Sequence, residues 1–136
     1  MLSVFKELQS NFQGEIYLDH SHKILYATDA SAYRELPIAV SIPANMQDLK
    51  SLVLFADKHQ LSLIPRTAGT SLAGQVVGQG IIVDLSKYFT QILEINKEEK
   101  WVKVEPGVVL DELNAEVAKH GLFFGPETST ANRCMM

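Results

Sequence analysis

Residues 65–75 read Pro-Arg-Thr-Ala-Gly-Thr-Ser-Leu-Ala-Gly-Gln and directly follow an apolar run at 61–64. The apolar run predicts a buried strand, so the small residues after it form a loop at the end of that strand. Small residues let a backbone turn tightly and bring successive N–H groups close to a ligand. The hydroxyls of Thr70 and Ser71 can donate to phosphate oxygens, and Arg66 can add charge-assisted hydrogen bonds. Composition alone favours an ordinary solvated loop and leaves a pyrophosphate cradle as the alternative.

Two well-known nucleotide-binding motifs are absent from this loop. No Gly-Lys-Ser/Thr triplet follows it, so the loop is not a P-loop. No Gly-x-Gly-x-x-Gly spacing occurs, so it is not a dinucleotide fingerprint either. The function of the loop must therefore be argued from its surroundings.

The segments around the loop alternate between short apolar runs and one clear helix. Runs at 38–42 and 81–85 predict strands, and 45–60 predicts an amphipathic helix that begins at a capping asparagine. The order strand, helix, strand, glycine loop, strand over 38–85 favours parallel pairing. Upstream, residues 2–12 predict a short helix, and two extended pieces at 16–18 and 24–26 are expected around a polar turn.

The second half of the chain has a different pattern. Apolar runs at 92–95 and 101–105 flank a charged turn and predict an antiparallel hairpin. A helix is expected over 110–120, followed by a short strand at 122–124. The fold class is therefore α+β, with a small parallel α/β layer followed by the start of a mixed or antiparallel layer.

Length, charge and cysteine content exclude several classes of protein. The 136 residues suit one domain, and a net charge of −4 argues against sequence-independent nucleic-acid binding. A single cysteine excludes an internal disulfide framework and a multi-cysteine zinc site, and it predicts a reducing, cytoplasmic location. No run of about 20 apolar residues predicts a transmembrane helix, and the N-terminus lacks the pattern of a secretory signal. The His20-x-His22 pair is expected to lie in a polar turn and not at a metal site.

The run Pro-Arg-x-x-Gly-Thr-Ser-Leu-Ala-Gly resembles the glycine loop of the PCMH-type FAD-binding domain of vanillyl-alcohol-oxidase-like flavoenzymes. The resemblance is nearest to the branch that contains glycolate oxidase and D-lactate dehydrogenase, and it covers about residues 22–136. Shorter segments match in order at 26–33, 40–43, 83–86, 104–108 and 125–129. The resemblance implies a lead-in helix and extended segment at 1–34 and the N-terminal portion of a PCMH-type domain at 35–136.

The resemblance implies that the chain binds FAD, in a parent enzyme that oxidises a small 2-hydroxy acid such as glycolate or D-lactate. Family members that attach the flavin covalently through this loop carry a histidine in it. None occurs in 65–75, so non-covalent FAD is expected. Arg66 is the one charged residue expected to contact the ligand, with a surface salt bridge as its alternative. The implied cofactor-binding residues are Arg66, Thr67, Ala68, Gly69, Thr70, Ser71, Leu72, Gly74, Gln75, Pro126, Glu127, Thr128 and Ser129.

Two departures from the family pattern affect these expectations. Thr67 stands where the family loop usually has glycine, so either the backbone is ordinary there or the local shape differs. The chain ends at Met136, where a second glycine-rich flavin-contacting stretch should begin. It therefore resembles the N-terminal part of a larger flavoenzyme, inactive alone, with the catalytic residues beyond Met136. The open strand edges of such a piece are compatible with a homodimer. The alternative is a stand-alone nucleotide- or phosphate-binding or interaction module without catalysis.

Overall fold

Three short strands that pair in parallel form the centre of the first of two lobes. The computed structural model describes residues 2–136, and side chains from residue 4 onward. Its sheet has the order β1-β2-β4-β3, in which β2 and β3 each pair with β4 in parallel and β1 pairs with β2 antiparallel. The strands are β1 (Glu15–Tyr17), β2 (Ala39–Ile42), β3 (Leu63–Arg66) and β4 (Ile81–Asp84). The parallel unit predicted over 38–85 is confirmed.

The sequence of each strand matches its place in the sheet. Every residue of β2 and β4 is buried, as expected for apolar runs covered on both faces. β3 lies at the edge of the sheet, where a proline is tolerated because one side of the strand needs no ladder hydrogen bonds. β3 therefore continues through Pro65 to Arg66, two residues beyond the predicted end, and Arg66 pairs in register with Asp84 of β4.

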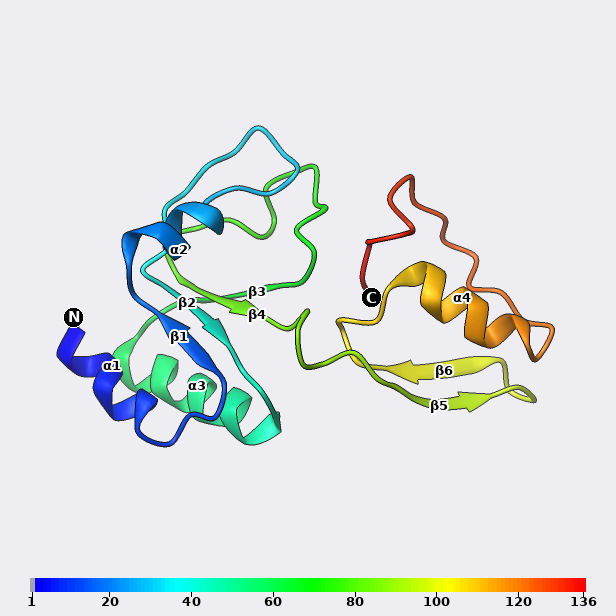
Figure 1. Ribbon diagram of the computed structural model, residues 1–136, viewed down its shortest axis with the longest axis horizontal. Coiled ribbons are helices and arrows are strands. Elements are labelled where there is room, and N and C mark those ends of the chain that lie inside the picture. The colour runs from blue at the N-terminus through cyan, green and yellow to red at the C-terminus, as the bar shows by residue number, and fades with distance from the viewer. Residues whose placement is uncertain (1) are drawn as a thin grey trace.

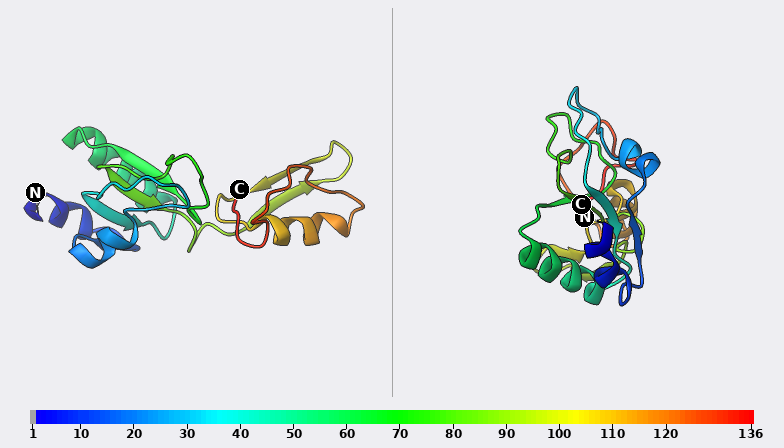
Figure 2. Two further views of the ribbon diagram at one scale, coloured as in Figure 1. Left: turned by 90° about the horizontal axis from the view of Figure 1, so that it is seen from above. Right: turned by 90° about the vertical axis from the view of Figure 1, so that its left-hand side faces the viewer.

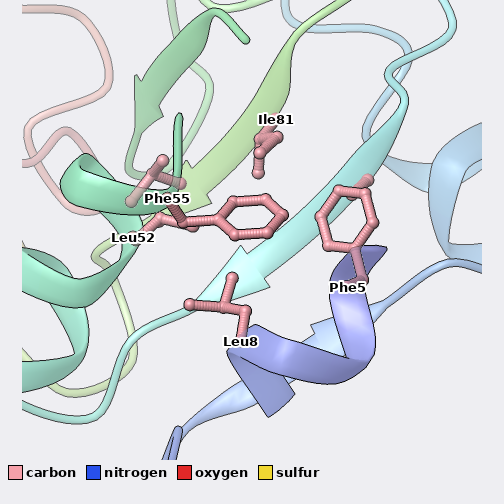
Figure 3. Packing of buried hydrophobic residues seen from close by; sticks show 7 residues of the cluster. Phe5, Leu8, Leu52, Phe55 and Ile81 are labelled. Atoms are coloured by element: carbon pink, nitrogen blue, oxygen red, sulfur yellow. The ribbon is translucent and has the colours of Figure 1, made fainter. Parts of the chain in front are cut away.

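Two helices cover this sheet with an apolar core. α3 (Met46–His59) begins where the Asn45 side chain accepts hydrogen bonds from two backbone N–H groups of the first turn. It packs against α1 (Leu2–Gln9), and the rings of Phe5 and Phe55 lie 5.1 Å apart between their centroids. Figure 3 shows how these helices and the sheet meet. The buried members of this cluster are Phe5, Leu8, Ala39, Leu52, Phe55, Ile81 and Val83.

Two of the sequence predictions are wrong in detail. Residues 24–26 are not extended, because α2 (His20–Leu25) forms there with Asp19 as its N-cap, whose side chain accepts the His22 N–H. Residues 122–124 do not form a strand, since the Phe124 N–H donates to the Asn114 side chain at 2.8 Å. In both places a side-chain acceptor captures the backbone N–H and decides the local structure.

The second lobe is built from the predicted hairpin and helix. β5 (Ile92–Asn96) and β6 (Trp101–Val104) pair antiparallel, and α4 (Leu110–Ala118) packs on them over its own core of Val108, Leu113 and Val117. The two lobes lie end to end, and the segment between β4 and β5 connects them (Figures 1 and 2). None of the helices described over residues 2–136 has both the length and the apolar character needed to span a bilayer.

The connecting segment is fastened at both of its ends. On the first lobe, one Glu15 oxygen accepts from the Lys87 ammonium at 2.5 Å and from the Tyr88 hydroxyl at 2.7 Å. On the second lobe, the Phe89 carbonyl accepts the Gly107 N–H at 2.7 Å. A Cβ at Gly107 would lie 2.6 Å from that carbonyl, so this close approach requires glycine.

A buried carboxylate attaches the N-terminal segment to the start of α3. Asp48 is 1% exposed, and its two oxygens accept from the backbone N–H groups of Gln13, Gly14 and Ala44 at 2.8–3.0 Å. These contacts hold the entry of β1 against the end of β2.

Replacing Asp48 by alanine should lower the free energy of unfolding by about 3 kcal/mol, because three backbone donors lose their acceptor in a buried position. Chemical denaturation measures the change. Asp57→Ala, on the exposed face of the same helix, is the matched control and should change stability by less than about 0.5 kcal/mol. Equal losses for the two variants would contradict the role given to Asp48.

Candidate functional site

The Arg66 side chain connects the end of β3 to the segment that follows α2. Its Nη1 donates to the Thr28 carbonyl at 2.8 Å and to the Tyr26 carbonyl at 3.3 Å. The guanidinium also lies over the Tyr26 ring, with Cζ 5.2 Å from the ring centroid. A backbone hydrogen bond from Ala30 N–H to the Gly69 carbonyl, at 3.1 Å, continues the same attachment into the glycine loop.

Tyr26 is fixed in turn by Asp84 at the end of β4. The Tyr26 hydroxyl donates to Oδ2 of Asp84 at 2.6 Å, and Oδ1 of Asp84 accepts the Ser86 N–H. Burial, followed by the hydrogen bond and the negative charge of Asp84, holds the pKa of Tyr26 well above its ordinary value. Tyr26 therefore stays protonated at neutral pH and acts as a hydrogen-bond donor.

The glycines of the loop are required by its shape. Gly69 has φ +68°, and a Cβ on it would lie 2.5 Å from an Arg66 guanidinium nitrogen. Gly74 has φ +73° and faces the Tyr33 ring. Among residues 2–136 the non-glycine residues with positive φ are Gln60 and Lys100, so Thr67 has an ordinary backbone. The first of the two possibilities left open for Thr67 is therefore the one observed.

The Ser71 hydroxyl is engaged within the loop. It donates to the Gln75 side chain, and its oxygen lies 3.4 Å from the backbone N–H of Gln75. Ser71 and Gln75 therefore close the loop on itself, and their polar groups face each other.

The segment 128–134 approaches the glycine loop from the second lobe. Val109, the N-cap of α4, makes no side-chain capping bond. Instead, the N–H groups of Leu110 and Asp111 donate to the carbonyls of Cys134 and Ala131 at 2.9 and 3.1 Å. The unpaired donors at the start of α4 thus hold the C-terminal segment in place.

An open cavity of about 510 Å³ lies between these parts of the two lobes. In Figure 1 the loop after β3 and the C-terminal segment face each other where the lobes meet. The first lobe contributes Leu25, Thr28, Asp29, Ala30, Arg66, Ala68, Gly69, Thr70 and Leu72. The second lobe contributes Thr128, Ser129, Thr130, Arg133 and Cys134.

The cavity brings together predicted cofactor-binding residues from two distant segments, the glycine loop at 66–75 and the segment at 126–129. Of the predicted set, Arg66, Ala68, Gly69, Thr70, Leu72, Thr128 and Ser129 line it, whereas Thr67, Ser71, Gly74, Gln75, Pro126 and Glu127 do not. The residues that sequence reasoning missed are Leu25, Thr28, Asp29, Ala30, Thr130, Arg133 and Cys134. For three of them, the sequence offered one indication, the predicted turn at 28–30. Its proximity to the glycine loop depends on tertiary contacts and could not be predicted.

Asp29 places a carboxylate in the wall of this cavity. Its Oδ1 accepts the Ser31 N–H at 2.9 Å, and its buried Oδ2 has no hydrogen-bond partner within residues 2–136. Burial works to raise the pKa of Asp29, but hydrogen bonds from Ser31 and from the backbone of Val76, together with the charge of Arg66, bring that pKa below its ordinary value. The site therefore contains an ionised acceptor beside its hydroxyl and N–H donors.

Tyr26→Phe should lower the free energy of unfolding at pH 7 by about 1–3 kcal/mol, because Asp84 loses a hydrogen bond to a charged acceptor. Since the pKa of Tyr26 is raised in the folded state, its contribution is complete below about pH 10 and is lost as the pH rises further. The difference in the free energy of unfolding between Tyr26→Phe and the wild type should therefore be smaller at pH 10.5 than at pH 7. Urea denaturation at the two pH values measures it. Tyr33→Phe, at an exposed tyrosine, is the control. A difference between Tyr26→Phe and the wild type that grew with pH would contradict the hydrogen bond from Tyr26 to Asp84.

Comparing Gly69→Ala with Gly121→Ala distinguishes the cost of backbone strain from the cost of crowding the Arg66 side chain. Both glycines have positive φ, but nothing lies within 4 Å of a Cβ at Gly121. Each variant should lose about 1–2 kcal/mol from the left-handed backbone. Gly69→Ala should lose more, and only its spectra should show the amide signals of residues 26–30 shifted, because Arg66 must move. Identical losses with unshifted signals would argue against the contact.

Known proteins are similar to this chain over most of its length. The family model described as the FAD binding domain matches residues 37–136. D-2-hydroxyglutarate dehydrogenase of Pseudomonas putida is 44% identical over 127 residues, which cover 91% of this chain and 13% of that protein. Glycolate oxidase subunit GlcD of Bacillus subtilis is 33% identical over 110 residues, covering 79% of this chain and 23% of that protein. The chain thus spans about an eighth of the first relative and a quarter of the second.

Solved structures agree on the fold. An alkyldihydroxyacetonephosphate synthase superposes with a TM-score of 0.82 at 17% identity, covering 99% of this chain and 30% of its own. At that identity the match supports the architecture alone. The match of the family model to most of the chain confirms the resemblance stated from the glycine loop. The chain belongs to the FAD-binding domain family, and FAD is the cofactor of that family.

Proposed function

We propose that this chain holds the FAD of an oxidoreductase that acts on a 2-hydroxy acid. The observation that supports this proposal best is the cavity in which the Gly69 loop faces the hydroxyl-bearing segment 128–130. FAD, when bound, accepts the hydride from the substrate carbon that carries the hydroxyl. The part played by this chain is to bind and orient the cofactor.

The cavity residues match the chemistry of FAD in three respects. Thr70, Thr128 and Ser129, which line the cavity, offer hydroxyl donors for phosphate oxygens. The Asp29 carboxylate, which lines the cavity, suits a hydroxyl donor such as those of a sugar or sugar alcohol. The side chains of Leu25 and Leu72 are 69% and 80% exposed at the cavity and suit the face of an aromatic ring.

The predicted cofactor residues take two roles within this proposal. Those that face the cavity contact FAD directly, namely Ala68, Gly69, Thr70, Leu72, Thr128 and Ser129. Arg66 also borders the cavity, but its guanidinium is engaged with the Tyr26 and Thr28 carbonyls. Thr67, Ser71, Gly74 and Gln75 shape the loop, and Pro126 and Glu127 lead the second segment into place. The absence of histidine from 65–75 supports non-covalent binding.

The relatives support a 2-hydroxy acid as the substrate class. The relative with the higher identity is named for D-2-hydroxyglutarate and the other for glycolate, and both acids carry a hydroxyl beside a carboxylate. D-2-Hydroxyglutarate is therefore the first substrate to test, ahead of glycolate and D-lactate. Cofactor binding without catalysis is the alternative function.

FAD titration of the intact protein tests the cofactor part of the proposal. Gly69→Asp should abolish binding, because a Cβ there displaces the Arg66 guanidinium from the cavity wall and the new carboxylate repels phosphate. Gly121→Asp, also at positive φ but away from the cavity, should keep the wild-type affinity. Quenching of flavin fluorescence reports both. Unchanged affinity in Gly69→Asp would refute the assignment of this loop.

Anaerobic mixing tests the substrate part. The FAD-loaded intact protein should lose its flavin absorbance on addition of D-2-hydroxyglutarate, glycolate or D-lactate, and the most rapid bleaching identifies the substrate. Acid precipitation should release the flavin into the supernatant if it is held non-covalently. A protein that binds FAD but is bleached by none of the acids would instead support the binding-module alternative.

A further inference from the structure

We propose that Arg133 is the cationic ligand of the cofactor's pyrophosphate and that Arg66 is a positioning residue. The proposal rests on the proposed FAD-binding function. The chain has three arginines, and two of them, Arg66 and Arg133, line the cavity between the lobes. The two roles follow from the hydrogen bonds that each guanidinium makes within the protein.

The guanidinium of Arg66 is already engaged with the protein. Its Nη1 is shared between the carbonyls of Thr28 and Tyr26, and its Cζ lies over the Tyr26 ring. One of its nitrogens lies 2.5 Å from the position that a Cβ on Gly69 would take, so the guanidinium is packed against the loop backbone. Turning this side chain toward a ligand would leave those carbonyls without their donor. Arg66 therefore shapes the cavity wall.

Arg133 lies across the cavity, and its side chain has no hydrogen-bond or ion-pair partner within residues 2–136. Lysines elsewhere do pair with acids, as Lys58 does with Glu7 and Lys87 with Glu15. Asp29 is the one acid among the residues that line the cavity, and it is held by Ser31 on the opposite lobe. The Arg133 charge is thus available to a ligand.

The backbone that carries Arg133 is well fixed. The N–H groups of Arg133 and Cys134 both donate to the Thr130 carbonyl, at 2.9 and 2.7 Å, which closes a tight turn. The start of α4 holds both sides of this turn through Leu110 and Asp111. The turn also presents Thr128, Ser129 and Thr130 to the same cavity.

The combination of a free guanidinium with neighbouring hydroxyls is suited to an anion. A guanidinium can bind two phosphate oxygens at once through parallel N–H groups, and hydroxyls donate to the remaining ones. Binding of the pyrophosphate by Arg133 would connect the second lobe to the glycine loop of the first lobe through the ligand.

The test compares three single variants of the intact protein by FAD titration at several salt concentrations and by thermal unfolding without ligand. Arg133→Gln should weaken FAD binding about 10- to 100-fold, reduce the salt dependence of the affinity and leave the ligand-free Tm unchanged. Arg34→Gln removes the same charge from an exposed arginine outside the cavity and should match the wild type. Arg66→Gln should lower the ligand-free Tm, because the Tyr26 and Thr28 carbonyls lose their donor. A fourth variant, Arg133→Lys, should recover part of the affinity lost in Arg133→Gln.

Each remaining outcome has a definite meaning. FAD affinity of Arg133→Gln equal to that of the wild type or of Arg34→Gln would overturn this inference and leave the proposed function intact. A fall in the ligand-free Tm of Arg133→Gln as large as that of Arg66→Gln would overturn it too, since the role would then be structural. A wild-type protein that bound no FAD would overturn both proposals.

Discussion

The hydrogen bonds from the Arg66 guanidinium to the carbonyls of Tyr26 and Thr28 organise the site. Arg66 ends β3 in register with Asp84, and its own carbonyl accepts the Leu85 N–H at 2.9 Å, so its backbone is fixed by the parallel sheet. From that position its side chain draws the segment after α2 against the glycine loop. Asp84 completes the arrangement by holding the Tyr26 hydroxyl. Each contact depends on two neighbouring parallel strands ending at the same edge.

The second wall of the cavity depends on a separate core. Val108, Leu113 and Val117 hold α4 on the β5–β6 hairpin, and the start of α4 then holds the segment that carries Arg133. The lobes have independent apolar clusters and are joined through a segment attached to Glu15 on one side and Gly107 on the other. A ligand in the cavity would contact both lobes. Its binding energy would therefore favour one arrangement of the two.

The spacing of apolar residues predicted the strands, the longer helices and the hairpin, because each element must place apolar side chains at regular intervals on the face that it buries. It failed at α2, a helix of six residues that depends on the Asp19 cap, and at 122–124, where Asn114 takes the backbone N–H that a strand would need. The glycine loop was predictable because Gly69 and Gly74 adopt backbone angles that other residues avoid. The position of Thr28 and Asp29 at the cavity was not predictable, because nothing in the sequence around them indicates that the Arg66 side chain binds this segment.

The sequence by itself determined that a strand leads into a glycine loop, that the loop belongs to an FAD-binding domain, and that a second polar segment follows at 126–129. The first of these conclusions rests on apolar spacing and backbone preferences, and the other two rest on the resemblance of the residue order to a known family. The tertiary structure decided which of the two arginines at the cavity is already engaged with the main chain. Arg66, conspicuous in the sequence, is engaged with main-chain carbonyls, and Arg133, which no motif distinguished, faces the cavity without a partner within the described residues. The availability of a charge depends on what surrounds it in space, and residue order alone does not contain that information.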